Sequence, residues 1–273
     1  MLYWNRMARS LLLRRSTASK GMKAAIVNNL AVEYIDEGKG PILFLLHGWG
    51  DNLHTFDSLL AKLSASFRVV RLDLPGFGGS EAPEESWGVE EYAYFVKSFI
   101  EKLGIPSYII IGHSFGGRIA IKGVGIGLLK PQKVVLISAA GLATNRKVRN
   151  QLLRLIAKIG KIALFPFSSD VKERLRLKLY RKVGGEDYIH AGALKETFLR
   201  VIGEDLSPAA QKINIPALLI WGEKDTATPL LNGKRLEELI PDSTLEVLEG
   251  AGHFVHQEKT DSVAALIQAF ISQ

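Results

Sequence analysis

The chain of 273 residues contains no cysteine. This absence excludes disulfide bonds, a thiolate nucleophile and cysteine-bound zinc, although it does not distinguish the cytosol from an oxidising compartment. The sequence also lacks an uncharged apolar run of about 18 residues or more, the length needed to span a membrane. Apolar residues make up 47% of the chain and charged residues 23%, a composition typical of globular proteins. We therefore expect a soluble protein with a substantial core.

Acidic residues are absent from residues 1–23 and scarce in residues 144–183, and these two segments hold all of the excess positive charge behind the net charge of +7. The first segment has six basic residues, and the second has twelve basic residues against two acidic ones. The rest of the chain has 17 basic and 26 acidic residues. Since no basic stripe crosses the body of the protein, we expect no binding of nucleic acid.

The basic segment at residues 1–23 has Leu11-Leu12-Leu13 between arginines, but this apolar run is too short for a secretory signal. We expect a disordered extension on a cytoplasmic protein. Two alternatives are an organelle-targeting peptide and an incorrectly chosen start site, since Met22 directly precedes the first strand-like segment.

From about residue 24 onward, short apolar runs alternate with segments that have helical periodicity. This alternation predicts an α/β fold with a mainly parallel sheet covered by helices on both faces. Ligand sites of such sheets lie beyond the carboxyl ends of the strands. The predicted strands are 31–34, 42–46, 69–72, 108–111, 134–138, 217–221 and 244–248, and the predicted helices are 53–64, 89–103, 115–124, 231–239 and 260–271.

The most informative motif is Gly112-His113-Ser114-Phe115-Gly116, which follows an apolar β-branched run and precedes a helical segment. The pattern Gly-x-Ser-x-Gly at a strand-to-helix turn predicts a nucleophile elbow, because small residues two positions before and after the serine let strand and helix approach closely. Ser114 is the predicted nucleophile, at a helix N-terminus that favours developing negative charge.

Two glycine-containing turns follow earlier strands. In His47-Gly48-Trp49-Gly50, the backbone N–H of Trp49 is a candidate oxyanion donor together with the N–H of Phe115, while His47 is interpreted as a structural hydrogen-bonding residue. The loop that begins at Asp73 lacks the Lys-Ser/Thr and the helix of a phosphate-binding loop, so we expect Asp73 to bind loop N–H groups instead.

A serine nucleophile needs an imidazole base, and a carboxylate must orient that imidazole. Among six histidines, His253 lies in a glycine-rich turn after the last strand, whereas we expect His256 to face the body and His113 to point away from Ser114. Asp225 follows the strand 217–221 and is preferred to Glu223 as the acid. The order Ser114, Asp225, His253 is the one expected for an elbow-based hydrolase.

On these motifs the chain resembles the α/β-hydrolase fold family, in the branch with an inserted cap, over about residues 24–273. The resemblance implies a hydrolase core at 24–142 and 217–273, and a helical cap at 143–216. Similar proteins include carboxylesterases, carbon–carbon bond hydrolases, lipases and cofactor-free perhydrolases. Relatives with an aspartate nucleophile, the haloalkane dehalogenases and epoxide hydrolases, are disfavoured by Ser114.

The cap segment contains a predicted basic amphipathic helix at 148–165, whose apolar face would roof an acyl pocket. Tyr180 and Tyr188 are weaker candidates for substrate contacts. The basic residues of the predicted helix 148–165 are interpreted as solvated. The alternative is a weak association of the cap or of the basic tail with a membrane surface.

These observations predict a serine hydrolase that cleaves a small or medium apolar carboxylic ester through an acyl-enzyme, without a metal or organic cofactor. A first alternative is a carbon–carbon bond hydrolase acting on vinylogous diketones, which would need a cationic anchor such as Arg118 or a cap arginine. A second is a non-catalytic binding protein of the same fold. The expected partner is a small-molecule ester or related carbonyl compound, and the oligomeric state stays open.

Overall fold

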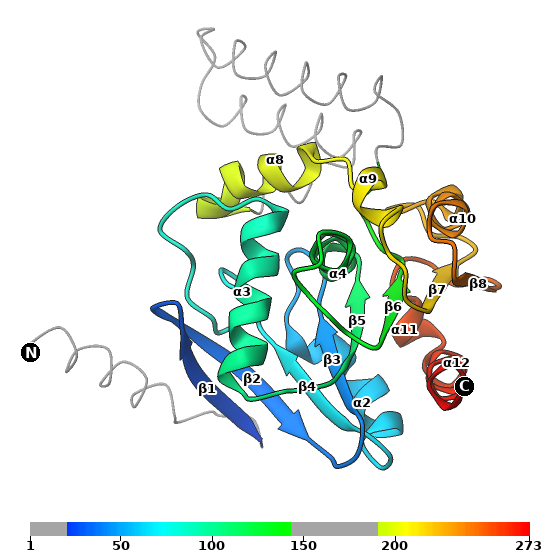
Figure 1. The fold of residues 1–273 in the computed structure, drawn as a ribbon, viewed down its shortest axis with the longest axis horizontal. Coiled ribbons are helices and arrows are strands. Elements are labelled where there is room, and N and C mark those ends of the chain that lie inside the picture. Colours follow the sequence, from blue (N-terminus) through cyan, green and yellow to red (C-terminus); the bar gives the residue numbers. More distant parts are fainter. Residues whose placement is uncertain (1–20, 143–190) are drawn as a thin grey trace, which may run out of the picture.

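A computed structural model describes residues 21–142 and 191–273. Its centre is an eight-stranded sheet in the order β1-β2-β4-β3-β5-β6-β7-β8 (Figure 1). The strands are β1 Met22–Val27, β2 Leu30–Glu37, β3 Ile42–Leu46, β4 Arg68–Leu72, β5 Ile109–His113, β6 Lys133–Ile137, β7 Ala217–Gly222 and β8 Ser243–Leu248.

Strands β4, β3, β5, β6, β7 and β8 pair in parallel, whereas β1 and β2 form an antiparallel hairpin whose second strand pairs antiparallel with β4. The predicted mainly parallel sheet is therefore confirmed, and β1 is the strand-like segment at Met22, for which no bounds were predicted. Asn28 and Asn29 turn this hairpin with φ angles of 47° and 65°. Two adjacent residues with positive φ suit the twist of a tight hairpin, and asparagine tolerates that conformation.

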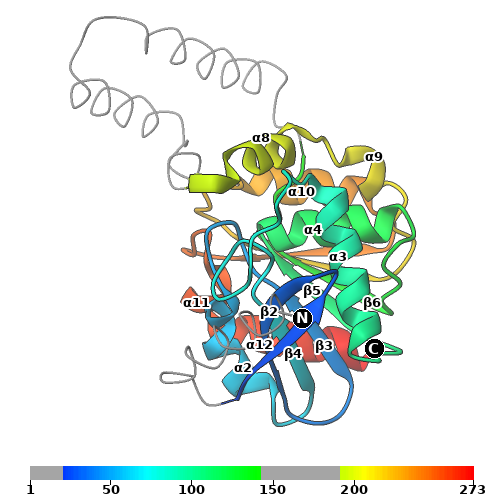
Figure 2. The same ribbon diagram turned by 90° about the vertical axis from the view of Figure 1, so that its left-hand side faces the viewer.

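Helices cover both faces of the sheet, as predicted (Figure 2). One face packs against α3 Val89–Lys102, α4 Phe115–Gly125 and α10 Leu230–Leu239. The other packs against α2 Asp57–Leu63, α11 Val255–Glu258 and α12 Thr260–Ser272. The predicted helix 53–64 is present as two elements, the short 3-10 turn η2 Leu53–Phe56 followed by α2.

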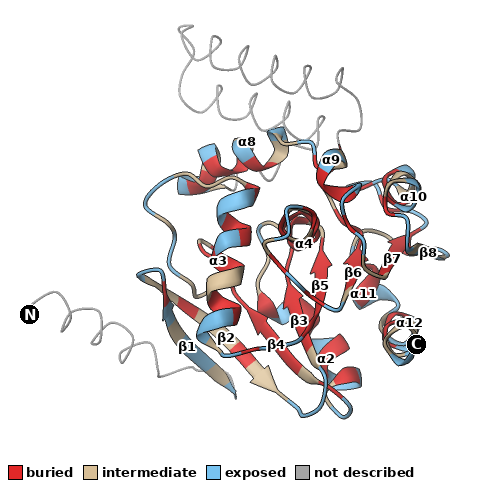
Figure 3. Ribbon diagram, in the orientation of Figure 1, coloured by how far each residue is buried: buried red, intermediate tan, exposed pale blue. Residues whose placement is uncertain are grey.

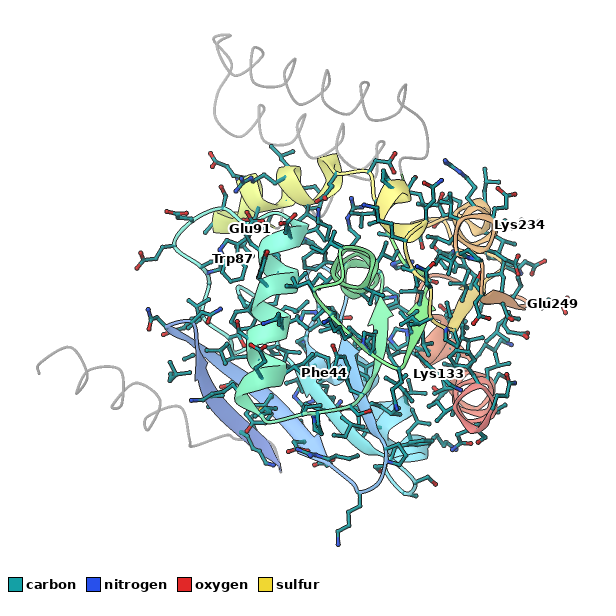
Figure 4. The ribbon with its side chains drawn as sticks, in the orientation of Figure 1. Phe44, Trp87, Glu91, Lys133, Lys234 and Glu249 are labelled. Carbon is teal, nitrogen blue, oxygen red and sulfur yellow. The ribbon has the colours of Figure 1, made fainter. Side chains whose placement is uncertain are left out.

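Alternate residues of the central strands enter the two cores. In β3, Phe44 and Leu46 belong to the core under α3, whereas Leu43 and Leu45 belong to the core under α2. Burial on both faces explains why β3 appears in the sequence as a continuous apolar run (Figure 3). Phe44 lies between the sheet and α3, where its ring centroid is 6.0 Å from that of Phe99 (Figure 4).

Of the predicted cap at 143–216, the structure describes residues 191–216. These form η3 Gly192–Leu194, α8 Lys195–Gly203 and α9 Ser207–Ala210. The Thr197 hydroxyl on α8 accepts a hydrogen bond of 3.1 Å from the N–H of Trp87, just before α3. The predicted helix 148–165, Tyr180, Tyr188 and nearly all of the basic tail lie outside the described residues, so the proposed domain boundaries stay predictions.

In the two described ranges, no helix is long and apolar enough to cross a lipid bilayer.

Candidate functional site

The predicted elbow is present at the end of β5. Ser114 connects this strand to α4 with φ 50° and ψ −106°, a backbone conformation that costs free energy in a non-glycine residue. A Cβ atom at Gly112 would lie 2.5 Å from the carbonyl oxygen of Gly116, and one at Gly116 would overlap the carbonyl oxygen of Leu46. The two glycines therefore allow the close approach that the motif predicts, and the turn leaves Ser114 partly exposed.

The two predicted oxyanion donors belong to turns that lie against each other. The N–H of Gly116 donates to the carbonyl oxygen of His47 at 3.0 Å, and a Cβ atom at Gly48 would lie 3.5 Å from that of Ser114. Within the described residues, neither the N–H of Trp49 nor that of Phe115 has a hydrogen-bond partner. Both groups thus lack an acceptor in this part of the chain, as the predicted oxyanion donors would without substrate.

The structure joins the predicted acid and base directly. Nδ1 of His253 lies 2.9 Å from Oδ2 and 3.1 Å from Oδ1 of Asp225. The Asp225 side chain is completely buried, whereas that of His253 is 17% exposed. Burial alone raises the pKa of Asp225, but hydrogen bonds from His253 and Thr228 outweigh this effect, so that the pKa lies below its usual range. Asp225 is thus a buried carboxylate that is charged at neutral pH and orients one imidazole.

Ser114 lies near this pair without being bonded to it. Among the described residues, no hydrogen bond joins the Ser114 hydroxyl to His253. The link between elbow and base is the preceding residue, His113, whose Nε2 lies 3.1 Å from the carbonyl oxygen of His253. The rings of His113 and His253 are 4.9 Å apart. A serine–histidine hydrogen bond is often long or misaligned without substrate, so its absence here leaves Ser114 a candidate nucleophile.

The other histidines at this edge of the sheet, His47, His113 and His256, are buried. This agrees with the structural role predicted for His47 and with the prediction that His256 faces the body. Nδ1 of His47 lies 2.7 Å from the carbonyl oxygen of Gly48, and its Nε2 accepts a hydrogen bond of 2.9 Å from the N–H of Leu74. Nε2 of His256 lies 3.2 Å from the hydroxyl of Thr55. Burial lowers the pKa of His47, holds that of His113 well below its usual value, and lowers that of His256 to about 4. These rings are uncharged at neutral pH and serve packing and hydrogen bonding.

Both carboxylates that were assigned to loop structure bind loop N–H groups. Asp73 accepts hydrogen bonds of 2.7 Å from the N–H groups of Leu53 and Gly79. Glu223 accepts one of 2.9 Å from the N–H of Gly250. Neither carboxylate contacts His253. Among the described residues, Asp225 is therefore the carboxylate that binds this histidine.

Arg118, one candidate anchor for a substrate carboxylate, is engaged elsewhere. Its guanidinium is buried and donates a hydrogen bond of 2.5 Å to the carbonyl oxygen of Glu204 at the end of α8. Burial lowers the pKa of Arg118 to about 10, so the group stays charged at neutral pH and holds α8 against the body. The structure therefore gives no support to Arg118 as a substrate anchor.

Two further residues, Thr228 and Phe198, contact the predicted site residues and do not belong to any of the sequence motifs. Thr228, three positions after Asp225, places its hydroxyl 2.8 Å from Oδ2 of Asp225 and 3.3 Å from Nδ1 of His253. Phe198 of α8 has its ring 5.1 Å from that of Trp49. The one signal for Thr228 in the sequence is its position three residues after Asp225. Phe198 lies on α8, far from Trp49 in the chain, and no motif in the sequence marks it.

In the described ranges, no three histidine, aspartate or glutamate side chains lie close enough together to bind a metal ion.

A model of the alpha/beta hydrolase family matches residues 43–266 of this chain. The chain belongs to this family. Pimeloyl-acyl-carrier-protein methyl ester esterase of Neisseria meningitidis serogroup C is 31% identical over 247 residues, which cover 84% of this chain and 93% of the esterase. The family supports the interpretation of the protein as a hydrolase.

Two solved structures illustrate the shared fold. A bacterial membrane phospholipase A superposes with a TM-score of 0.75 and 24% identity, covering 98% of this chain and 91% of its own. A meta-cleavage product hydrolase from Pseudomonas fluorescens superposes with a TM-score of 0.70 and 22% identity, covering 92% and 97%. At this level of identity the likeness establishes the fold and leaves the substrate open.

Proposed function

We propose that the protein is a serine hydrolase that cleaves small or medium apolar carboxylic esters through an acyl-enzyme. The observation that carries this proposal is the hydrogen bond of 2.9 Å between His253 and buried Asp225, beside a serine held on a strained elbow. A buried carboxylate that orients an imidazole next to an elbow serine is the arrangement needed to activate a hydroxyl nucleophile.

In the proposed mechanism, Ser114 attacks the ester carbonyl while His253 takes the hydroxyl proton. Asp225 holds the imidazole in the required tautomer and stabilises its charged form. The N–H groups of Trp49 and Phe115 receive the negative oxygen of the tetrahedral intermediate. Proton transfer from His253 releases the alcohol, and a water molecule activated by the same residue then hydrolyses the acyl-enzyme.

The preference for an apolar substrate is supported by the aromatic side chains around the oxyanion turn. The ring of Trp49 lies 4.9 Å from that of Phe77, 5.3 Å from that of Phe115 and 5.1 Å from that of Phe198. Trp49 itself is half-buried, so part of its ring is accessible. Apolar groups of a bound ester would contact such a surface at a low cost in desolvation. The methyl ester esterase among the relatives agrees with a carboxylic ester as the substrate.

The test begins with a fluorophosphonate probe, which forms a covalent bond with an activated serine. We expect labelling of the full chain at Ser114 and none in Ser114→Ala. Absence of labelling in the folded wild-type protein would favour a non-catalytic hydrolase-fold protein.

A substrate panel then separates the two enzymatic alternatives. It compares p-nitrophenyl esters of increasing acyl length with a dienoic ring-fission product. We expect turnover of short and medium esters. Preference for the ring-fission product would instead assign carbon–carbon bond hydrolysis.

A further inference from the structure

Thr228 occupies the point where the acid, the base and a neighbouring strand meet. It lies in the loop between β7 and α10, and it is 6% exposed. Its hydroxyl oxygen is 2.8 Å from Oδ2 of Asp225, 3.0 Å from the carbonyl oxygen of Ser138 and 3.3 Å from Nδ1 of His253. A buried hydroxyl costs free energy unless it forms hydrogen bonds, and this one has three partners.

The roles of these partners follow from their chemistry. A threonine hydroxyl has one hydrogen to donate and lone pairs to accept with. Asp225 and the Ser138 carbonyl are acceptors, and the charged carboxylate is the stronger acceptor at the shorter distance. When the Thr228 hydroxyl donates its hydrogen bond to Asp225, a lone pair of the same oxygen faces the Nδ1–H of His253. The same oxygen atom then contacts both members of the acid–base pair.

Backbone hydrogen bonds complete this arrangement. Oδ1 of Asp225 accepts hydrogen bonds of 2.9 Å from the N–H groups of Ala227 and Thr228, while Oδ2 faces the Thr228 hydroxyl. With both oxygens bound, the carboxylate plane is fixed relative to the imidazole. Bonds from one residue to both oxygens would keep the carboxylate from rotating as charge develops on His253.

Ser138 connects Thr228 to the nucleophile. It directly follows β6, whose last residue, Ile137, accepts a hydrogen bond of 3.1 Å from the N–H of Ser114. The N–H of Ala140 donates to the carbonyl oxygen of Ser114, also at 3.1 Å. The contact between Thr228 and Ser138 therefore joins the loop of the acid to the segment that holds the elbow.

We propose that Thr228 is a positioning residue for the proposed ester hydrolysis, on which this inference rests. Its hydroxyl holds the Asp225 carboxylate and the His253 ring in the orientation that His253 needs to accept the proton of Ser114. Thr228 contacts the Asp225 carboxylate and Nδ1 of His253, which is not the ring nitrogen that would take the serine proton. It acts through Asp225 and His253.

The decisive variant is Thr228→Val, which keeps the shape of the side chain and removes the hydroxyl. We expect kcat for a p-nitrophenyl ester to fall about tenfold or more, because a hydrogen bond to a charged group contributes at least that factor. KM should stay within about twofold, since no substrate contact changes. Thr228→Ser, which keeps the hydroxyl, should restore kcat to within about threefold of wild type.

Thr226→Val is the matched control, because it is the same substitution on an exposed residue of the same loop. It should leave kcat unchanged. Wild-type kcat in Thr228→Val would overturn the proposal. So would an equal loss in Thr228→Ser or in Thr226→Val, since the loss would then come from the methyl group or from the loop. If Thr228→Val is unfolded by circular dichroism, Thr228→Ala replaces it in the same comparison.

A second measurement is independent of activity. Proton NMR detects the imidazole Nδ1–H of His253 when a carboxylate protects it from exchange with water. We expect this resonance in wild type and Thr228→Ser, and its shift or loss in Thr228→Val. An unchanged resonance in Thr228→Val would overturn the positioning role. Failure of the proposed function is recognised separately, by the absence of fluorophosphonate labelling and ester turnover in the wild-type protein.

Discussion

The elbow around Ser114 and the pair formed by Asp225 and His253 are held in place by different means. The elbow is fixed by its backbone, with a φ angle of 50° at the serine and with Gly112 and Gly116 where no side chain fits. The pair is fixed by side-chain hydrogen bonds, in which Asp225 binds two backbone N–H groups, a hydroxyl and an imidazole. The elbow is thus sensitive to added atoms, and the pair to the loss of one polar atom.

The largest effect is expected from Ser114→Ala, which removes the reacting atom and leaves the backbone of the elbow in place. For the nucleophile of a comparable triad, kcat falls by about six orders of magnitude. Ester turnover under saturating substrate measures the change, and an unchanged circular dichroism spectrum shows that the fold persists. Activity close to wild type would remove Ser114 from the mechanism.

On the acid–base side, Asp225→Asn keeps the size of the side chain but offers His253 an amide in place of a carboxylate. The imidazole then loses its orientation and the support for its charged form, and kcat should fall by about four orders of magnitude at neutral pH. Glu223→Gln is the matched control, because Glu223 binds the N–H of Gly250 and has no contact with His253. A larger loss in the control than in Asp225→Asn would reassign the acid.

The backbone side is tested by Gly116→Ala, which adds a single methyl group. That group would overlap the carbonyl oxygen of Leu46, so strand and helix must separate. We expect the free energy of unfolding in urea to fall by about 3 kcal/mol, at the upper end of the usual cost of overpacking. Gly203→Ala is the control, since no atom lies within 4 Å of its added Cβ. Equal stability of the two variants would contradict the steric account of the elbow.

The smallest expected effect is a pH dependence of stability from Asp225. Because the pKa of Asp225 is lower in the folded protein than its ordinary value near 3.9, the ionised carboxylate stabilises the fold above about pH 4. That contribution is lost as the pH falls through the pKa of the folded state. The difference in melting temperature between wild type and Asp225→Asn should therefore shrink below pH 4. A difference independent of pH would show that charge on Asp225 adds nothing to stability.

The sequence was sufficient for features that depend on local backbone demands. Glycine spacing identified the elbow, and the position of Asp225 and His253 after successive strands identified the pair, because a parallel sheet collects its strand ends at one edge. Strand β1 was noticed only as a strand-like segment after Met22 and was given no bounds, because its run of four apolar residues is short and the strand is half exposed at the edge of the sheet. Thr228 was missed because its role depends on the position of Ser138 and His253, which are 90 and 25 residues away in the chain.

The aromatic contact between Phe198 and Trp49 has a consequence for protein engineering. Trp49 supplies a proposed oxyanion donor through its backbone and contacts Phe198 of α8 through its ring. Replacement of α8 with a segment from a relative would therefore change the support of the oxyanion turn. In a chimera that exchanges part of the predicted cap, residues 191–216 are better kept with the recipient, so that the crossover falls before Ala191 and the contact between Phe198 and Trp49 is preserved.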